Sequence, residues 1–444
     1  MRPVVFIVDA VLAALVLPAA AADAQPPPGL SWHAPTPIAA GRGERGPWQQ
    51  NESRYDYVDD ATVAFIGGGD LAVAWVDQRR KDVFIQKAGA ADGRRVGPPG
   101  KVSRSPGTFS WHPRIAVAPG RTGGVYVLWQ EIIFSGGSHG GDILFARSGD
   151  GGVHFSEPVN LSRSRGGDGK GRLDRTTWSN GSHDLAVAAN GDVLAAWTEY
   201  HGALWFARSR DGGASFTAPR RVAGDDARPA RAPALATGPD GAVWLAWTVR
   251  EDPAADIHVA QSRDGGASFG PAQRVGAGPG HADAPRLAID GEGAVHLVYA
   301  EAPAGRGGRP EIRYARSKRG AGRFSAPRTI SAAASSMGTG GAGYPAIGTD
   351  GREGLYVTWE VLDAATARPG SLQIAASLDG GERFTQPAPV PGSAAAPGAS
   401  NGSHQGLLGK KLAVDGSGRL AIVNSSMLRG VSSRVWLLRG RASP

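Results

Sequence analysis

The sequence feature that most constrains the fold is an eight-residue segment that recurs along the chain. Residues 209–216 read Ser-Arg-Asp-Gly-Gly-Ala-Ser-Phe, and residues 262–269 repeat them letter for letter. Variants stand at 148–155 and 377–384, and a degraded copy without the aspartate stands at 317–324. Recurrence at such a period indicates an array of similar structural modules rather than unrelated domains.

Each copy has the chemistry of a tight turn between two β-strands, and we call these segments the Asp turns. The aspartate side chain can accept hydrogen bonds from backbone N–H groups that follow it, and the glycines supply the positive φ angles. The closing phenylalanine begins the next strand and can pack into the interior. The sequence therefore predicts a structural role for the aspartates of the four intact copies, Asp150, Asp211, Asp264 and Asp379.

The chain around each Asp turn fits one frame of four short strands. In the unit 185–222, an apolar strand leads to an Asn-Gly turn at 190–191, and a second strand ends at Trp197. A loop, a third strand, the Asp turn and a fourth strand follow. Alternating apolar strands bounded by such turns are typical of β-hairpins. The same frame fits six other units, at 61–102, 113–161, 233–275, 285–330, 345–390 and 412–438.

The last unit ends after three strands, and the sequence predicts its fourth strand at the other end of the chain. Residues 30–38 have the aromatic-x-x-Pro pattern of the fourth strands, as at 216–219. Pairing them beside 435–438 would close a ring and remove an exposed sheet edge. Four-stranded repeats of this size are typical of propeller blades. The predicted fold is an all-β propeller of seven blades. Six blades, or two β-sandwich domains, are the alternatives.

Residues 1–24 have the pattern of an export signal. Arg2 is followed by an apolar stretch that Asp9 interrupts, and Ala22-Asp23-Ala24 gives a small-x-small cleavage site. We therefore expect residues 25–444 to form one secreted or periplasmic domain. A disordered or membrane-anchored N-terminus is the alternative. No other stretch approaches the roughly 18 apolar residues that a membrane span requires.

Composition excludes several classes of function. The chain has no cysteine, which excludes disulfides, thiolate metal sites and covalently attached haem. The net charge of +8 would suit nucleic acid, but the arginines are scattered over every repeat and no basic–aromatic strip appears. A generally basic surface instead suits anionic glycans or the cell envelope. We expect a monomer with no cofactor and no nucleic-acid partner.

The pattern Ser-x-Asp-x-Gly-x-x-Phe resembles the Asp-box, or BNR repeat, of the sialidase superfamily. The resemblance covers most of the chain beyond the export signal. It implies a propeller that acts on or binds carbohydrate, with an exo-sialidase-like glycoside hydrolase as the catalytic form. Asp boxes also occur in receptors and in propellers without known catalysis, so a non-catalytic binding or scaffolding propeller for an envelope or extracellular partner is the alternative.

Blade geometry predicts which face carries the site. Strands alternate in direction, so the Asp turns lie on one face and the variable second–third and inter-blade loops lie on the other. Function usually sits on variable loops held by a rigid frame. Carboxylates, arginines and a tyrosine around one axial pocket suit glycoside chemistry, although they would also suit the lining of a channel mouth. The polar residues that the frame aims there include Arg114, Arg231, Arg286, His112, His183, Asp283, Tyr344, Glu199 and Glu301.

The family resemblance implies individual roles. The run 74–82 is similar to the family segment after the second strand of the first blade, which makes Asp82 the acid/base. Tyr344, in Gly-Tyr-Pro, stands where the blade of the nucleophile begins, and Glu199 or Glu301 would be its carboxylate partner. Arg231 and Arg286 would clamp a substrate carboxylate. The family's Arg-Ile-Pro motif is absent from the first blade, where Arg54 lies a few residues upstream.

A five-residue segment that occurs twice supplies the last candidate ligand-binding residues. Residues 179–183 and 400–404 both read Ser-Asn-Gly-Ser-His, before the third and seventh units. His183 and His404, with His112 and His281 nearby in the frame, could hold a metal together with Glu131 or Glu199. Asn-Gly is also a plain turn signal, and we predict turns there and no metal site.

Overall fold

The computed structural model describes residues 29–47, 49, 52–104, 107–120, 123–135, 138–163, 182–199, 202–225, 227–250, 255–276, 280–303, 308–331, 340–402 and 409–442. For residues 132–141 it describes the backbone alone within these ranges. The predicted export signal and His404 lie outside the described residues.

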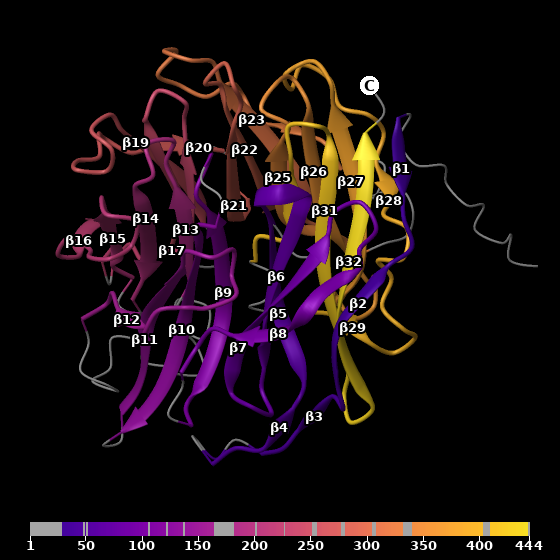
Figure 1. Ribbon diagram of the computed structural model, residues 1–444. Helices are drawn as coiled ribbons and strands as arrows, with labels where there is room; N and C mark the ends of the chain where they lie inside the picture. Colours follow the sequence, from indigo (N-terminus) through magenta and orange to yellow (C-terminus); the bar gives the residue numbers. More distant parts are fainter. Residues whose placement is uncertain are drawn as a thin grey trace, which may run out of the picture.

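Seven antiparallel sheets follow one another around a central axis, which confirms the predicted seven-bladed propeller (Figure 1). Blade one consists of β5 (Val58–Ile66), β6 (Asp70–Asp77), β7 (Asp82–Gly89) and β8 (Arg95–Lys101). Blade two consists of β9 (Phe109–Val117), β10 (Val125–Ser135), β11 (Ser138–Ser148) and β12 (Val159–Asn160). Blade three consists of β13 (His183–Val187), β14 (Val193–Thr198), β15 (Leu204–Ser209) and β16 (Arg220–Ala223).

The next three blades repeat the order, with the first strand innermost. Blade four consists of β17 (Ala230–Thr237), β18 (Val243–Val249), β19 (Asp256–Ser262) and β20 (Gln273–Val275). Blade five consists of β21 (His281–Ile289), β22 (Val295–Ala302), β23 (Glu311–Ser317) and β24 (Arg328–Thr329). Blade six consists of β25 (Gly341–Thr349), β26 (Leu355–Leu362), β27 (Pro369–Ser377) and β28 (Ala388–Pro389).

Blade seven joins the two ends of the chain. It consists of β30 (Leu412–Val414), β31 (Arg419–Leu428), β32 (Ser432–Ala442), the short β29 (Ser400–Asn401), and the N-terminal β1 (Leu30–Trp32) and β2 (Thr36–Gly41). Trp32 lies opposite Gly440, and Pro37 lies opposite Trp436. The predicted closure is confirmed, and β1 and β2 lie beside β32 in Figure 1. The predicted single strand 30–38 is divided in two because residues 33–35 leave the ladder before Thr36.

Two small elements complete the described chain. The hairpin β3 (Glu44–Arg45) and β4 (Tyr55–Asp56) precedes blade one. The helical content of the described residues is the 3₁₀ turn η1 (Gly67–Gly69). No helix in the described part of the chain is long and apolar enough to cross a membrane.

The hydrophobic core lies between neighbouring blades. Each main cluster combines the facing sides of two adjacent sheets, which is why the strands are apolar on both faces. The aromatic residues that end the second strands, among them Trp129, Trp197 and Trp359, are fully buried in these clusters. In the closing blade, Leu30 packs toward blade six and Ile38 packs toward blade one. The hydrophobic core of the ring is therefore divided among the contacts between neighbouring blades, and the stability of the ring depends on each of them.

The aspartates of the Asp turns accept hydrogen bonds from within their own turn. Asp211 Oδ1 accepts hydrogen bonds from Ser215 N at 2.9 Å and from Ser209 Oγ at 2.7 Å. Gly212 and Gly213 have φ angles of 65° and 81°, which L side chains rarely adopt. Phe216 then packs edge-on against Phe145 of the preceding blade, with ring centroids 4.9 Å apart. Each such turn therefore closes its own hairpin and docks on its neighbour.

Ring closure can be tested by truncation. A chain that begins at residue 42 lacks β1 and β2, leaves one edge of β32 unpaired and exposes the surface that Leu30 and Ile38 cover. We expect it to lose at least about 3 kcal/mol of unfolding free energy, from two buried aliphatic side chains alone, and to aggregate through the free edge. Denaturant unfolding measures this. The control chain begins at residue 29, and equal stability of the two chains would contradict the closure.

The Asp turns should make the free energy of unfolding depend on pH in the acidic range. Burial raises the pKa of Asp379, but hydrogen bonds from Arg383 N, Arg383 Nε and Ser377 Oγ outweigh it and hold the pKa at about 2. The unfolded value is about 3.9. Because the folded pKa is lower, the stabilisation is complete above about pH 4 and is lost as the pH falls through about 2. Urea midpoints should show Asp379→Asn less stable than wild type at pH 5, with the gap closing toward pH 2. A gap that does not change with pH would contradict this.

Candidate functional site

The innermost strands of five blades share a distortion at their loop-rich end. One non-glycine residue in each has a φ angle between 49° and 56°, and the pairing register of all five strands slips directly around it. A β-bulge of this kind re-aims the neighbouring side chains, and each left-handed residue costs on the order of 1–3 kcal/mol. Four of the five precede a proline. The residues are Asp60, His112, Ala232, Ala284 and Tyr344.

An ion pair spans the axis of the ring at this end. Lys410, which precedes the first strand of blade seven, places its Nζ 3.0 Å from Asp184 Oδ1 in blade three and also donates to Leu185 O. Blades three and seven are not neighbours, so the lysine side chain must cross the channel. Leu235 N of blade four donates to the other oxygen of Asp184 at 2.7 Å. The Asp184 carboxylate therefore links blades three, four and seven.

Two buried arginines flank the Asp184 carboxylate. Burial lowers the pKa of Arg114, and the nearby charge of Arg286 lowers it further, to about 10. Burial also lowers the pKa of Arg286, with Asp184 and Asp283 acting in the opposite direction. The guanidinium groups donate to carbonyl oxygens of their own bulges, Arg114 to Pro113 O and Arg286 to Pro285 O. The predicted Arg114 and Arg286 thus lie deep in the channel.

The predicted histidines His112 and His183 lie beside Arg114. His183 Nε2 is 2.6 Å from His112 O, and the two rings meet edge-on with centroids 6.4 Å apart. Burial, with the positive charge of Arg114, holds the pKa of His183 well below its usual range, so this imidazole is neutral. His112 N donates to Asp60 Oδ2 at 3.2 Å. Both histidines are almost fully buried and couple blades one, two and three.

A second group lies toward solvent on blades four, five and six, and we call it the Arg231 cluster: Arg231, Thr248, His281, Asp283 and Tyr344. Arg231 Nη2 is 3.2 Å from Asp283 Oδ2 and 3.4 Å from His281 Nε2. Thr248 Oγ1 donates to Asp283 Oδ1 at 2.8 Å. The side chains of Asp283 and His281 are 33% and 25% exposed, so the cluster is open to a ligand on one side.

The electrostatics of the cluster fix two protonation states. Burial would raise the pKa of Asp283, but the charge of Arg231 and hydrogen bonds from His281, Thr248 and Ala284 N hold it at about 2, so the carboxylate stays ionised. Burial raises the pKa of Tyr344, and the carboxylates of Asp283 and Glu360 raise it further. Tyr344 is therefore a protonated phenol beside an ionised acid.

Arg231 has unused donor capacity. Its side chain is 11% exposed, and its Nε is buried with no acceptor among the described residues. A buried N–H group without a partner costs free energy, which a ligand oxygen would recover. Glu360, the other carboxylate near Tyr344, is by contrast satisfied: it pairs with Lys411 and accepts from Asn401 Nδ2 at 3.1 Å.

The remaining predicted site residues lie elsewhere. Asp82, at the start of β7, is 2.7 Å from Lys101 Nζ and accepts from Ser103 Oγ at 2.7 Å, near the outer strand of blade one. Glu301 pairs with Arg313 on β23 at 3.0 Å. Glu199 follows β14 and is half-buried, and Arg54 is exposed beside the β3–β4 hairpin. Arg231 and Arg286 both border Asp283, whereas Arg54 is not among their described contacts.

Sequence reasoning placed His281 on the loop-rich face only as a possible metal ligand, and it did not single out Thr248 or the crossing of Lys410 to Asp184. The available signal was the X-Pro dipeptide at 112–113, 232–233, 284–285 and 344–345, which marks the bulge in four blades. Among the described residues there is no group of three or more side chains arranged to hold a metal ion.

Comparisons with known proteins relate this fold to solved structures. No family model and no curated protein matches the chain. An ulvan lyase of a polysaccharide lyase family aligns over 90% of this chain and 94% of its own, with a TM-score of 0.54 and 12% identity. The polysaccharide lyase Uly1 aligns over 92% and 100%, with 0.53 and 11%. A variant of NanB sialidase from Streptococcus pneumoniae aligns over 80% and 70%, with 0.49 and 9%. At these identities the likeness to the two lyases is one of fold alone.

Replacing Lys410 by methionine should test the ion pair across the axis. Lys410→Met keeps most of the apolar stem but leaves the buried Asp184 without its cation, so we expect a loss of about 1–3 kcal/mol of unfolding free energy. Chemical denaturation measures it. Lys318→Met, at an exposed lysine in the degraded Asp turn, is the control and should cost little. Equal midpoints for the two variants would show that the pair contributes nothing to stability.

Proposed function

We propose that this chain is an enzyme that binds an acidic carbohydrate at the Arg231 cluster and breaks its glycosidic bond. The observation that carries the proposal is the half-open cluster with a buried, unpartnered donor on Arg231. A guanidinium held on one side by Asp283 and free on another is suited to a carboxylate ligand. We further propose that the protein acts after export, in the periplasm or outside the cell, as residues 1–24 indicate.

The first candidate reaction is β-elimination, which would use the protonated phenol of Tyr344 beside Arg231. Arg231 would bind the carboxylate of a uronate residue and so increase the acidity of the carbon next to it. His281 would accept the proton from that carbon, while Tyr344 donates its phenolic proton to the glycosidic oxygen on the neighbouring carbon. The carbon–oxygen bond breaks and a carbon–carbon double bond forms, so no water is consumed. The fold shared with ulvan lyase and Uly1 supports this reading without establishing it.

Hydrolysis is the second candidate, and the position of Tyr344 favours it. The tyrosine begins blade six between two carboxylates, as the resemblance to Asp-box sialidases implies for the nucleophile. Its phenolic oxygen would attack the anomeric carbon, a carboxylate would accept the phenolic proton, and water would release the sugar. Asp82 would be the acid/base, although its contacts with Lys101 and Ser103 also suit a structural role. A non-catalytic binding propeller is the remaining alternative.

The two reactions have different products, which gives the test. The mature chain is incubated with ulvan, with polyglucuronate and with a chromogenic sialoside. New non-reducing ends that absorb in the ultraviolet identify elimination, because the new double bond is conjugated with the carboxylate; dye release from the sialoside identifies hydrolysis. In either case Tyr344→Phe should lower kcat by on the order of 10²–10⁴-fold, and Arg231→Lys should mainly raise KM, because it removes the planar fork that holds the carboxylate.

Two further variants sharpen the result. Tyr356→Phe, on β26 of the same blade, removes a buried phenol outside the cluster and should retain turnover. Asp82→Asn should lower kcat in the hydrolytic route and leave the eliminative route unchanged. Saturable glycan binding without turnover of any polymer would overturn the enzymatic proposal in favour of a binding propeller. Full activity of Tyr344→Phe would overturn the role assigned to the tyrosine.

A further inference from the structure

A cavity lies on the Asp-turn face, away from the Arg231 cluster, in the crevice between blades two and three. Its volume is about 630 Å³, and its lining includes Tyr126, Arg147, Asp150, His154 and Gly212. This volume is within the range of about 300–1,000 Å³ that small-molecule sites occupy. Comparison with the equivalent crevices between other pairs of blades, which side chains fill, shows why this one is open.

In the crevice between blades three and four, an arginine and an aspartate fill the space. Arg208 is 8% exposed, and its Nη1 donates to Asp264 O at 2.9 Å and to Gly265 O at 2.8 Å in the Asp turn of the next blade. The buried carboxylate of Asp192 borders the same Gly265. Arginine thus ties one blade to the next and has an acidic neighbour.

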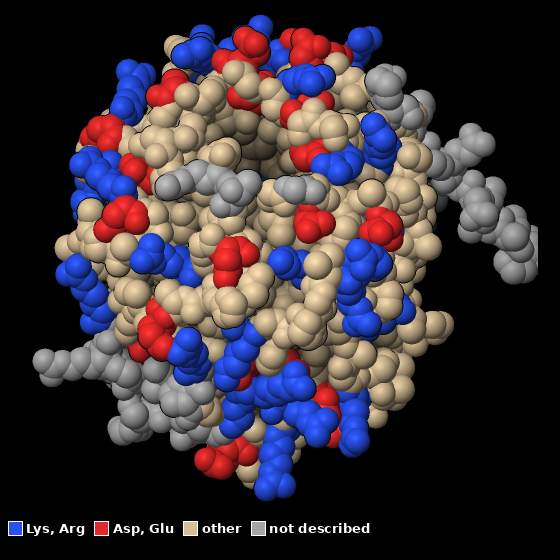
Figure 2. Space-filling view, viewed as in Figure 1, with Lys and Arg blue, Asp and Glu red and all other residues tan. Residues whose placement is uncertain are grey.

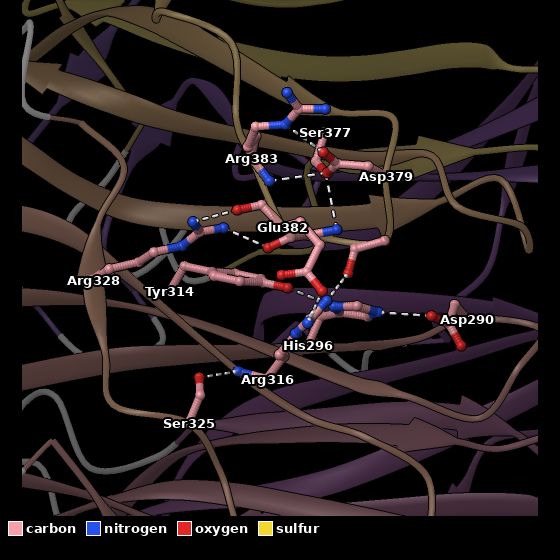
Figure 3. A network of polar contacts seen from close by, with 12 residues as sticks. Asp290, His296, Tyr314, Arg316, Ser325, Arg328, Ser377, Asp379, Glu382 and Arg383 are labelled. Atoms are coloured by element: carbon pink, nitrogen blue, oxygen red, sulfur yellow. Dashed lines mark hydrogen bonds and ion pairs between the residues drawn. The ribbon is translucent and has the colours of Figure 1, made fainter.

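The crevice between blades five and six is filled in a related way (Figure 3). Arg316 Nη1 donates to Gly380 O at 2.8 Å, and its Nη2 contacts Glu382. Behind it, the buried His296 lies 3.0 Å from Asp290 Oδ2 and 2.8 Å from Tyr314 Oη. Here too the arginine has acceptors in the next Asp turn.

Between blades two and three the same positions are occupied differently. Arg147 corresponds to Arg208, since each directly precedes the serine of its Asp turn, yet Arg147 is exposed and its guanidinium has no acceptor among the described residues. Gly124 stands where Asp192 stands, directly before the second strand, and contributes no side chain. In the crevice between blades three and four a second arginine, Arg220, pairs with Phe206. Its counterpart here is Val159, which pairs with Phe145, so this crevice lacks the second arginine as well.

The acids that line the cavity are already satisfied. Asp150 accepts from Ser148 Oγ at 2.7 Å, from the backbone N–H groups of Val153 and His154 at 3.0 Å, and from His154 Nδ1 at 2.7 Å. Burial opposes these bonds, but together they lower the pKa of Asp150 well below its usual range. The groups left to a ligand are therefore the Arg147 guanidinium, the far nitrogen of His154 and the polar edge of Tyr126.

We propose that this cavity binds the carboxylate of a small sugar acid, which takes beside Arg147 the place that Asp192 takes beside Arg208. Arg147 pairs with the carboxylate, and the sugar ring occupies the rest of the cavity, beside Tyr126. The site does not depend on the proposed catalytic function, since it lies on other blades and on the opposite face.

Binding of D-glucuronate to the full chain tests the proposal, with D-glucose as the uncharged comparison. Saturation-transfer NMR and calorimetry should detect glucuronate and not glucose. The measurement is made in the Arg231→Leu background, so that the Arg231 cluster does not contribute. There, Arg147→Leu should weaken glucuronate binding at least about tenfold, the factor that corresponds to losing one charge-assisted hydrogen bond. A trimeric glucuronide that binds more tightly than the monomer would identify a polymer end as the ligand, and equal affinities would identify the free acid.

Arg210→Leu is the matched control. It removes an exposed arginine from the neighbouring Asp turn, next to Asp211 and outside the lining of the cavity, and should leave binding unchanged. Equal affinity of Arg147→Leu and its parent, or no glucuronate signal from the parent, would overturn the proposal. Because Arg147 is exposed and ties no other blade, its replacement should not unfold the protein, which thermal melting verifies.

Discussion

The structure depends on the pairing of β1 and β2 with β32. A propeller blade covers its apolar faces with its two neighbours, so a ring that does not close leaves two such faces in water. Closure here uses strands from both ends of the chain, with Leu30 packed toward blade six and Ile38 toward blade one. Only in the closed ring does Lys410 of blade seven reach Asp184 of blade three. The axial groups are therefore a consequence of closure.

The two faces of the ring have specialised in different ways. On the Asp-turn face, the turns close hairpins and tie successive blades through arginines such as Arg208 and Arg316. On the loop-rich face, strained residues at five bulges re-aim polar side chains around the channel. Figure 2 shows basic and acidic side chains interspersed over the side of the molecule that it presents. The candidate sites arise where the repeated pattern is broken.

Strain and unmet hydrogen bonds coincide at the Arg231 cluster. Tyr344 holds a positive φ angle, and Arg231 keeps a buried donor without a partner. A stable scaffold can retain such costs because the blades on either side fix the backbone, and sites that bind ligands commonly carry them. In the deeper channel, Asp184 is bonded from blades four and seven. We propose the ligand site on blades four to six because Arg231 has a donor that is unpartnered within the described part of the chain and its partners Asp283 and His281 are partly exposed.

The sequence by itself determined the architecture. The recurring Asp turns, the second-strand aromatics and the displaced fourth strand near Trp32 predicted seven blades and their closure, because each is a local pattern with a local physical cause. It also pointed to Arg231, Arg286 and Tyr344 as residues of the inner face. It did not determine which of these would meet. Whether Arg231 faces Asp283, or Lys410 crosses to Asp184, depends on bulges and on distances across the ring, and those follow from the packing of all seven blades together.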